Sequence, residues 1–188
     1  YKNVRSRLMI LTLLTTNTIT SSTNTCNFTS NINSTYDEYM FVITDWHISG
    51  DGAGIRFQAS TDSGSNYNVI HTTTAFDAEH TEAGGGAVLQ YLTSSDYAQS
   101  TTGPHIALAV GNDADQSVAG IVHLFSPAST TYVKHFYSRT NTYNYDNLSA
   151  DFFGAGYFNT TSAIDAIQFE PEGSSTIDNA VIQMYGVA

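Results

Sequence analysis

Charged side chains are scarce in this sequence. Lys, Arg, Asp and Glu make up 12% of its 188 residues, about half the share in typical globular proteins. Six basic residues stand against 17 acidic ones, which gives a formal net charge of −11. Nucleic acids and anionic lipid surfaces are bound through Lys and Arg. The charge balance therefore predicts no nucleic-acid partner and no membrane partner.

Cysteine and long apolar runs are also lacking. Cys26 is the single cysteine, so an intrachain disulfide and a cysteine zinc site are both excluded. No run approaches the ~20 apolar residues of a membrane span. Lys2, Arg5 and Arg7 precede a short apolar run at 8–14, which resembles the first two regions of a signal peptide. We predict instead that 7–16 is a strand, with 1–16 as an N-terminal strand or arm.

Motifs of known catalytic chemistry are missing as well. The six histidines show neither HExxH nor His-x-His spacing, and no GxSxG segment is present. The glycine run 84–86 follows Glu79 and Glu82 and has no lysine beside it, so it predicts a loop tip and not a phosphate cradle. His123 and His135 lie in alternating segments and are candidates for cross-strand neighbours. We predict that the protein is not an enzyme.

Strand and turn residues dominate what is present. Ser, Thr and Asn form about a third of the chain, with 12 Tyr and 10 Phe. Alternating apolar runs recur between Gly-containing turns, a spacing typical of sandwiches and barrels. We predict an all-β fold, a single jelly-roll-like antiparallel β-sandwich that forms one domain over 1–188. The predicted strands are 7–16, 24–30, 36–48, 53–61, 66–74, 87–92, 105–110, 118–126, 131–140, 151–159, 163–171 and 180–187.

The last two predicted strands are apolar on both sides. Near the C-terminus Val181, Gln183 and Tyr185 alternate with Ala180, Ile182 and Met184. A strand of this kind suits the middle of a sheet, or a sheet whose outer face meets another subunit. In 163–171 the alternation fails around Asp165, where we expect a bulge or a short turn.

Two stretches carry candidate ligand-binding residues. Asn112, Asp113 and Asp115 place oxygen ligands at close spacing, as a hard cation such as calcium requires, although the full EF-hand pattern is missing. The aromatic residues Tyr36, Tyr39 and Trp46 lie among carboxylates, a combination that describes a shallow sugar-binding site.

Four glycosylation sequons leave a further class of protein open. They begin at Asn27, Asn33, Asn147 and Asn159, and in a secreted eukaryotic glycoprotein they would carry glycans. A chain this rich in Asn, Ser and Thr also produces such triplets by composition alone.

Several segments together resemble a family of small virion proteins of tailed bacteriophages, especially marine ones. The resemblance covers roughly residues 24–187 and is most specific at the C-terminal end. Two features depart from the family pattern: the turn sequence EPEGS at 170–174, and the entry into the last strand through Asn179 and Ala180. The residues that match are Tyr36, Asp37, Tyr39, Phe41, Gly120, Phe125, Pro127, Thr130, Thr131, Tyr132, Ala163, Ile164, Ile167, Phe169, Tyr185 and Gly186.

The resemblance implies a non-enzymatic structural role on the surface of a virion, as a capsid-decorating or fibre subunit or a tail-associated piece. It supplies no catalytic residues. The expected partners are other virion subunits and further copies of this chain, with a trimer as the expected oligomer, and no cofactor is expected. The alternative is a glycan- or host-receptor-binding β-sandwich module built around Tyr36, Tyr39 and Trp46.

Overall fold

The chain forms strands wherever Thr, Val, Ile and aromatic residues alternate, because these residues pack well on a pleated surface. A computed structural model describes residues 10–188. One 3₁₀ turn, η1, spans Thr93–Ser95. The strands are β1 (Leu11–Ile19), β2 (Cys26–Phe28), β3 (Glu38–Ile48), β4 (Ala53–Ser60), β5 (His71–Thr81), β6 (Val88–Tyr91), β7 (His105–Val110), β8 (Val118–Phe125), β9 (Lys134–Asn144), β10 (Leu148–Phe158), β11 (Ala166–Pro171) and β12 (Ile177–Val187).

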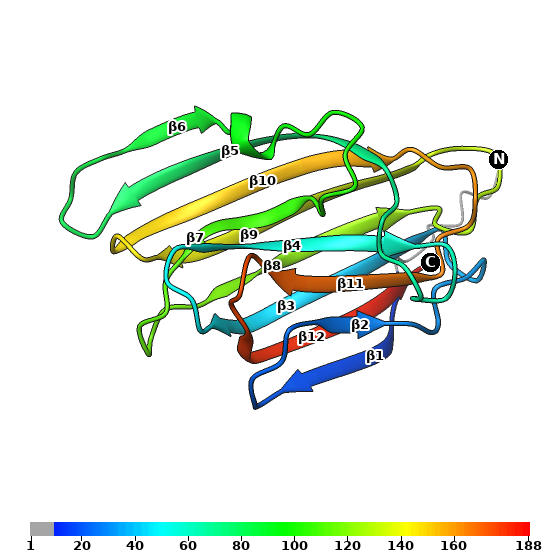
Figure 1. The fold of residues 1–188 in the computed structure, drawn as a ribbon, viewed down its shortest axis with the longest axis horizontal. Coiled ribbons are helices and arrows are strands. Elements are labelled where there is room, and N and C mark those ends of the chain that lie inside the picture. Colours follow the sequence, from blue (N-terminus) through cyan, green and yellow to red (C-terminus); the bar gives the residue numbers. More distant parts are fainter. Residues whose placement is uncertain (1–9) are drawn as a thin grey trace, which may run out of the picture.

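Two antiparallel sheets face each other (Figure 1). The large sheet has the order β1-β12-β3-β8-β9-β10-β5-β6, and the small sheet has the order β2-β11-β4-β7. Successive strands β1, β2, β3 and β4 alternate between the sheets, and β8, β11 and β12 do so again. This strand order, in two four-stranded sheets β1-β12-β3-β8 and β2-β11-β4-β7, is that of a jelly roll. The predicted all-β, jelly-roll-like sandwich is confirmed.

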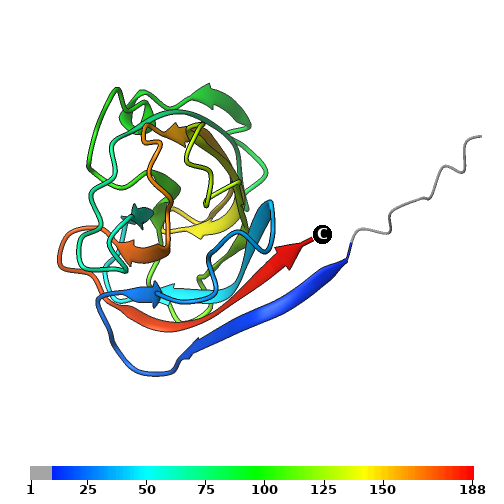
Figure 2. The same cartoon turned by 90° about the vertical axis from the view of Figure 1, so that its right-hand side faces the viewer.

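The large sheet continues beyond the jelly roll through β9, β10, β5 and β6. The long hairpin of β9 and β10 keeps one register from Asn144 opposite Leu148 to Lys134 opposite Phe158. The two sheets meet where Val110 of β7 pairs with Asn144 of β9. Seen end-on, the sheets curve toward closure while β1 and β12 run along one side (Figure 2).

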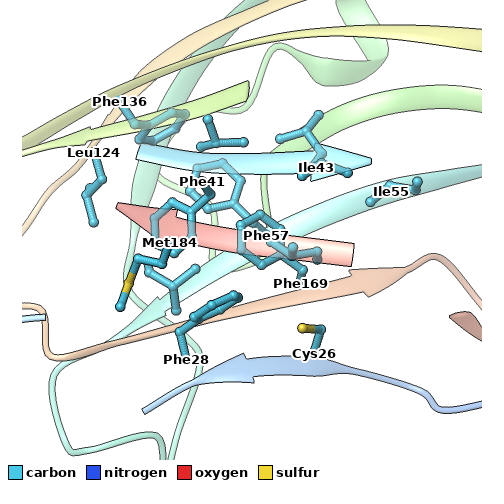
Figure 3. Close-up of a cluster of buried hydrophobic side chains, with 14 of the residues drawn as sticks. Cys26, Phe28, Phe41, Ile43, Ile55, Phe57, Leu124, Phe136, Phe169 and Met184 are labelled. Carbon is cyan, nitrogen blue, oxygen red and sulfur yellow. The ribbon is translucent and has the colours of Figure 1, made fainter. Parts of the chain in front are cut away.

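Aromatic rings fill the space between the sheets (Figure 3). Phe57 of the small sheet lies between Phe136, at 4.9 Å between ring centroids, and Phe169, at 6.0 Å. Phe28 makes an edge contact with Phe41 at 5.2 Å. Edge-to-face and offset stacking of this kind stabilises the core beyond simple burial. Cys26 is buried beside these rings as a free thiol, and its burial raises the pKa of the thiol.

The N-terminal strand lies later than predicted. Of the predicted strand 7–16, residues 11–16 belong to β1, which runs on to Ile19. Residues 1–9, including the predicted arm and the start of that strand, lie outside the described residues.

Several other predicted boundaries were wrong, and at the first two a carboxylate side chain holds the neighbouring turn in place. The predicted strand 66–74 is β5 at 71–81, since the Asp62 carboxylate accepts hydrogen bonds from the Asn66 backbone N–H (2.9 Å) and side-chain amide (2.7 Å). These bonds, with one from Ser60, lower the pKa of Asp62 to about 2. The strand predicted from residue 163 begins at Ala166, as Asp165 instead accepts the Ser63 N–H at 2.9 Å.

The third wrong boundary concerns the hairpin between β9 and β10. The strands predicted at 131–140 and 151–159 continue toward each other to Asn144 and Leu148. Their tight turn contains no glycine. Asn147 supplies the left-handed conformation instead, with φ of 56°, which asparagine tolerates better than most residues.

Candidate functional site

The outer face of the large sheet carries apolar or aromatic side chains on each of its strands, next to polar ones such as Glu38, Asn141 and Gln183. Successive side chains of a strand point to opposite faces. The burial pattern of each strand and its register with its neighbours therefore show which side chains point outward. In β9 the buried residues Phe136 and Ser138 alternate with the exposed Tyr137 and Arg139. The outward apolar and aromatic residues of neighbouring strands are Leu11, Leu13, Met40, Val42, Phe76, Leu89, Tyr91, Ile121, His123, Phe125, Tyr137, Phe153, Tyr157, Val181, Tyr185 and Val187.

Aromatic rings on this face stack on one another. Phe76 and Phe153 lie parallel at 4.7 Å, with an interplanar angle of 6°. The Arg139 guanidinium covers Phe153 at 4.9 Å from the ring centroid and pairs with the Asp151 carboxylate at 2.7 Å. The same guanidinium thus joins a cation–π contact to an ion pair, both on the sheet surface.

A second stack lies on β8 and β9. His123 packs on Tyr137 at 4.4 Å and beside Phe125 at 6.2 Å. The His123 Nδ1 lies 2.5 Å from the Glu38 carboxylate. The Glu38 carboxylate is therefore paired with His123, as Asp151 is with Arg139. A partner would meet mainly aromatic and apolar groups on this part of the face.

Two shallow hollows mark the face. One of about 520 Å³ is lined by Ile121, His123, Tyr137, Arg139 and Asp151, among others. Another of about 460 Å³ lies over Phe125, His135 and Tyr157. Hollows with aromatic walls accept protruding side chains of a partner, which is how the centres of protein interfaces are built.

The small sheet presents a polar outer face. Gln168 of β11 lies between Gln58 of β4 and Asn27 of β2 in one cross-strand row. The Gln168 side-chain amide donates to the Asn27 side chain at 2.9 Å, and Gln58 donates to the Thr101 carbonyl at 2.9 Å. Thr101 lies in the segment between η1 and β7, so the chain itself covers part of this face.

The three aromatic residues proposed as a sugar site are placed differently from one another. Tyr39 and Trp46 point into the core and are 0% exposed. The Tyr39 hydroxyl donates to the Asn33 carbonyl at 2.9 Å and accepts the Asn33 N–H at 3.0 Å. Tyr36 packs edge-on against Tyr39 at 5.9 Å. Stacking on a sugar needs an exposed ring, and only Tyr36 keeps part of its ring surface accessible.

The proposed calcium ligands lie in the loop from β7 to β8. The Asp113 backbone N–H donates to the Gln116 side chain at 2.9 Å, and the Asn112 side chain donates to the Ser49 carbonyl at 3.0 Å. These bonds hold the loop as an Asx-rich turn. Among residues 10–188 no three His, Cys, Asp or Glu side chains are grouped as a metal ion would need.

His123 and His135 do not face each other across strands. His123 lies opposite Tyr137, and His135 lies opposite Tyr157. The two histidines are therefore diagonal neighbours on the outer face.

One constellation escaped the sequence analysis entirely. The His105 Nδ1 accepts a hydrogen bond from the Ser95 hydroxyl at 2.9 Å, and its Nε2 lies 2.9 Å from the Glu172 carboxylate. The same carboxylate forms an ion pair with Arg56. Ser95 and His105 are 10 residues apart, but Glu172 lies 67 residues beyond His105, so no local motif signals the cluster.

Burial controls the charges of this cluster. It lowers the pKa of His105, which the bond to Glu172 only partly offsets. Burial by itself would raise the pKa of Glu172, but the bonds and charges of His105 and Arg56 outweigh it and lower that pKa. Ser95 and His105 are 2% and 7% exposed, so a substrate cannot reach the hydroxyl in this conformation. The arrangement ties η1, β4, β7 and the turn after β11 together.

Comparison with known proteins found no similar chain: no protein-family model, no curated protein and no solved structure matches. In the part of the chain that the structure describes, no helix is long and apolar enough to cross a membrane.

Proposed function

We propose that this protein is a non-enzymatic structural subunit that self-assembles through the outer face of its large sheet. The observation that carries the proposal is the aromatic outer face of the large sheet. Aromatic residues are enriched and charged residues depleted at the centres of protein interfaces. An exposed apolar face of this breadth marks an interaction surface in a folded protein.

The particle we propose for this subunit is the virion of a tailed bacteriophage, where it decorates the capsid or forms part of a fibre. The support is the sequence resemblance to small virion proteins over residues 24–187. Jelly rolls build viral capsid proteins, but also lectins and cupins, so the fold is compatible with the role without selecting it. The partners are other virion subunits and further copies of the chain, with a trimer as the expected oligomer.

The burial of Ser95 and His105 supports the non-enzymatic part of the proposal. A nucleophile works only where a substrate can be placed within about 3 Å of it. In this chain His105 links loops through its contacts with Ser95 and Glu172. Glu172 is in turn paired with Arg56, and its carboxylate also accepts the Gly54 N–H at 3.1 Å.

Light scattering coupled to size-exclusion chromatography tests the assembly directly. A trimer has three times the chain mass of 20.3 kDa. Tyr137→Lys should lower the assembled mass because it places an ammonium in the middle of the contact face, and losing the stack on His123 should cost only about 1 kcal/mol of stability. The matched control is Tyr145→Lys, since Tyr145 is also 45% exposed but lies in the turn between β9 and β10. Equal masses for both variants and the unaltered chain would contradict the face as the contact.

The virion itself is tested by imaging. Density for this chain in a symmetric shell or spike of the native particle is the expected result. A chain absent from the particle that binds selected sugars on a glycan array would favour the alternative, a glycan- or host-receptor-binding module.

A further inference from the structure

The large sheet ends at β1, and this edge is open. Within residues 10–188, β12 is the only strand that pairs with β1, and β1 borders the molecule with no other strand beyond it (Figure 2). We propose that the free edge of β1 pairs antiparallel with β1 of a second copy, so that the two large sheets continue into one another across a two-fold axis. This contact rests on the proposed self-assembly and adds a specific site to it.

The register shows which backbone groups are free. Ile10 and Ala188 exchange two hydrogen bonds, at 3.0 and 3.1 Å. Antiparallel pairs alternate between bonded and non-bonded positions, and β1 has one irregularity between Leu13 and Thr15. Counting along the register, the residues whose N–H and C=O groups point away from β12 are Leu11, Leu13, Thr16 and Thr18.

The side chains of the inner side anchor β1 to the rest of the molecule. The Asn17 side chain donates to the Asn27 carbonyl at 3.0 Å, and the Asn31 side chain donates to the Thr15 hydroxyl at 3.4 Å. Both bonds run toward the segments around β2. β1 is thereby held in the extended conformation that pairing with another strand requires.

Apart from the irregularity between Leu13 and Thr15, β1 lacks the devices that normally protect an edge strand. Such strands are usually very short, or carry Lys, Pro or other charged residues. The other two edge strands, β2 and β6, are three and four residues long, whereas β1 has nine residues. Between Arg7 and Asp37 the sequence contains no charged residue, no proline and no glycine. The one long edge is therefore also the unprotected one.

The charge distribution selects a second copy as the occupant. Two copies with a net charge of −11 each repel one another, so a stable contact between them must avoid carboxylates. β1 carries none, and an antiparallel pair of identical uncharged strands places no like charges opposite each other. A positively charged partner would gain nothing at β1 and would bind the acidic loops instead.

The side chains of β1 fit the same conclusion. Leu11 and Leu13 are 48% and 50% exposed and point to the outer face. Leu13 lies opposite Tyr185 on β12, so the apolar outer face reaches the very edge of the sheet. A two-fold pairing of β1 would join the outer faces of two copies into one surface. Two-fold contacts of identical patches are the commonest form of homo-oligomer.

Thr16→Pro tests the pairing. It removes an N–H that points away from β12 and leaves the β12 ladder intact, which edge strands tolerate. We expect the mass measured by light scattering to fall to half while each chain stays folded, with the melting temperature lowered only by the loss of the contact. Thr16→Lys keeps the N–H and brings an ammonium from each copy into the uncharged pairing strands, so it should also halve the mass and decides the matter if the proline variant does not fold. Thr16→Val keeps both the N–H and the strand propensity, and should assemble as the unaltered chain does.

The outcomes separate this contact from the proposed function. Masses unchanged in both Thr16→Pro and Thr16→Lys would overturn the β1 pairing while leaving assembly through the outer face intact. A trimer formed through the outer face would become a hexamer by two-fold pairing of β1, so an odd number of copies in the unaltered chain would also overturn the pairing. A chain that stays at 20.3 kDa at every concentration would overturn both proposals.

Discussion

The two sheets of this sandwich turn chemically different outer faces to their surroundings. The small sheet shows amides and charges that the chain itself satisfies, as in the row Asn27, Gln168 and Gln58. The large sheet shows stacked rings, such as Phe76 on Phe153, and Phe76 stays 44% exposed. Antiparallel sheets with one solvated face normally alternate apolar and polar residues. The small sheet follows that rule, and the large sheet breaks it.

The difference between the two outer faces indicates which residues serve a purpose other than folding. Residues of the inner face already supply a full aromatic core, so Tyr137 and Phe153 are not needed to stabilise the isolated chain. Exposed rings also carry a cost in solubility and aggregation. The proposed contact with further copies would account for their presence on one face, beside the β1 edge.

The largest loss of stability is expected at Phe57, a core residue that contacts both sheets. Phe57 is 1% exposed and touches rings of both sheets. Phe57→Ala should lower the free energy of unfolding by about 3–5 kcal/mol, because it removes a buried ring and leaves a cavity. Urea denaturation followed by tryptophan fluorescence measures this change through the buried Trp46.

An exposed ring provides the contrast for Phe57. Phe76→Ala on the outer face, where the side chain is 44% exposed, should cost about 1 kcal/mol. If the two variants lost the same stability, the outer face would have to be treated as part of the core, and the comparison of the two faces would fail.

A smaller change in stability is expected when pH is lowered, because His105 of the small sheet is buried. Folding lowers the pKa of His105 by burial, so below the ordinary histidine value of about 6.5 the unfolded chain binds more protons than the folded one. Protonation then favours unfolding, and this contribution to stability is lost as pH falls below about 6.5. His71 acts in the same direction, again because burial lowers its pKa.

Other titratable groups also contribute to the pH dependence of the unfolding free energy, so a variant is needed to isolate the contribution of His105. Burial raises the pKa of Asp77 and of Glu79, and these carboxyls favour the folded state as pH falls. His105→Gln should make the curve of unfolding free energy against pH flatter between pH 7 and pH 5.5. Parallel curves for the variant and the unaltered chain would contradict a neutral, buried His105.

The smallest effect is expected on the polar face. Gln168→Ala removes the bond to Asn27 from a partly exposed row, so it should cost about 1 kcal/mol or less. Its assembled mass should equal that of the unaltered chain in light scattering. A loss of assembly here would show that the small sheet, and not the large one, carries the contact.

Much of the fold could be predicted from alternation alone. The alternating runs located β4, β7 and β8 to within one residue and β3 to within two, since period-two burial is imposed locally by the pleat. The alternation of β12 was also predicted correctly, with Ile182 and Met184 buried and Gln183 and Tyr185 facing outward. The start of β5 and the turn before β10 were missed, because side-chain bonds of Asp62 and the φ of Asn147 set them.

The candidate site could be predicted only in part. The two-sided last strand predicted either an interior strand or an outer face that meets another subunit, and β12 does lie inside the large sheet, between β1 and β3. The alternation did not show which strands share a face. Tyr39 and Trp46 were proposed as ligand-binding residues because they lie near carboxylates in the sequence. Neighbours along a strand point to opposite faces, so nearness in sequence did not place these rings on the surface.

The sequence by itself determined the fold class, the acidic charge and the uncharged stretch between Arg7 and Asp37, because composition and period-two alternation are local properties. Only the tertiary structure decided that this stretch forms the open edge of the large sheet, that Tyr137 and Phe153 share a face, and that Ser95, His105 and Glu172 meet. Those relations depend on which strands pair. Strand pairing is settled by burying one common core over long separations in the chain.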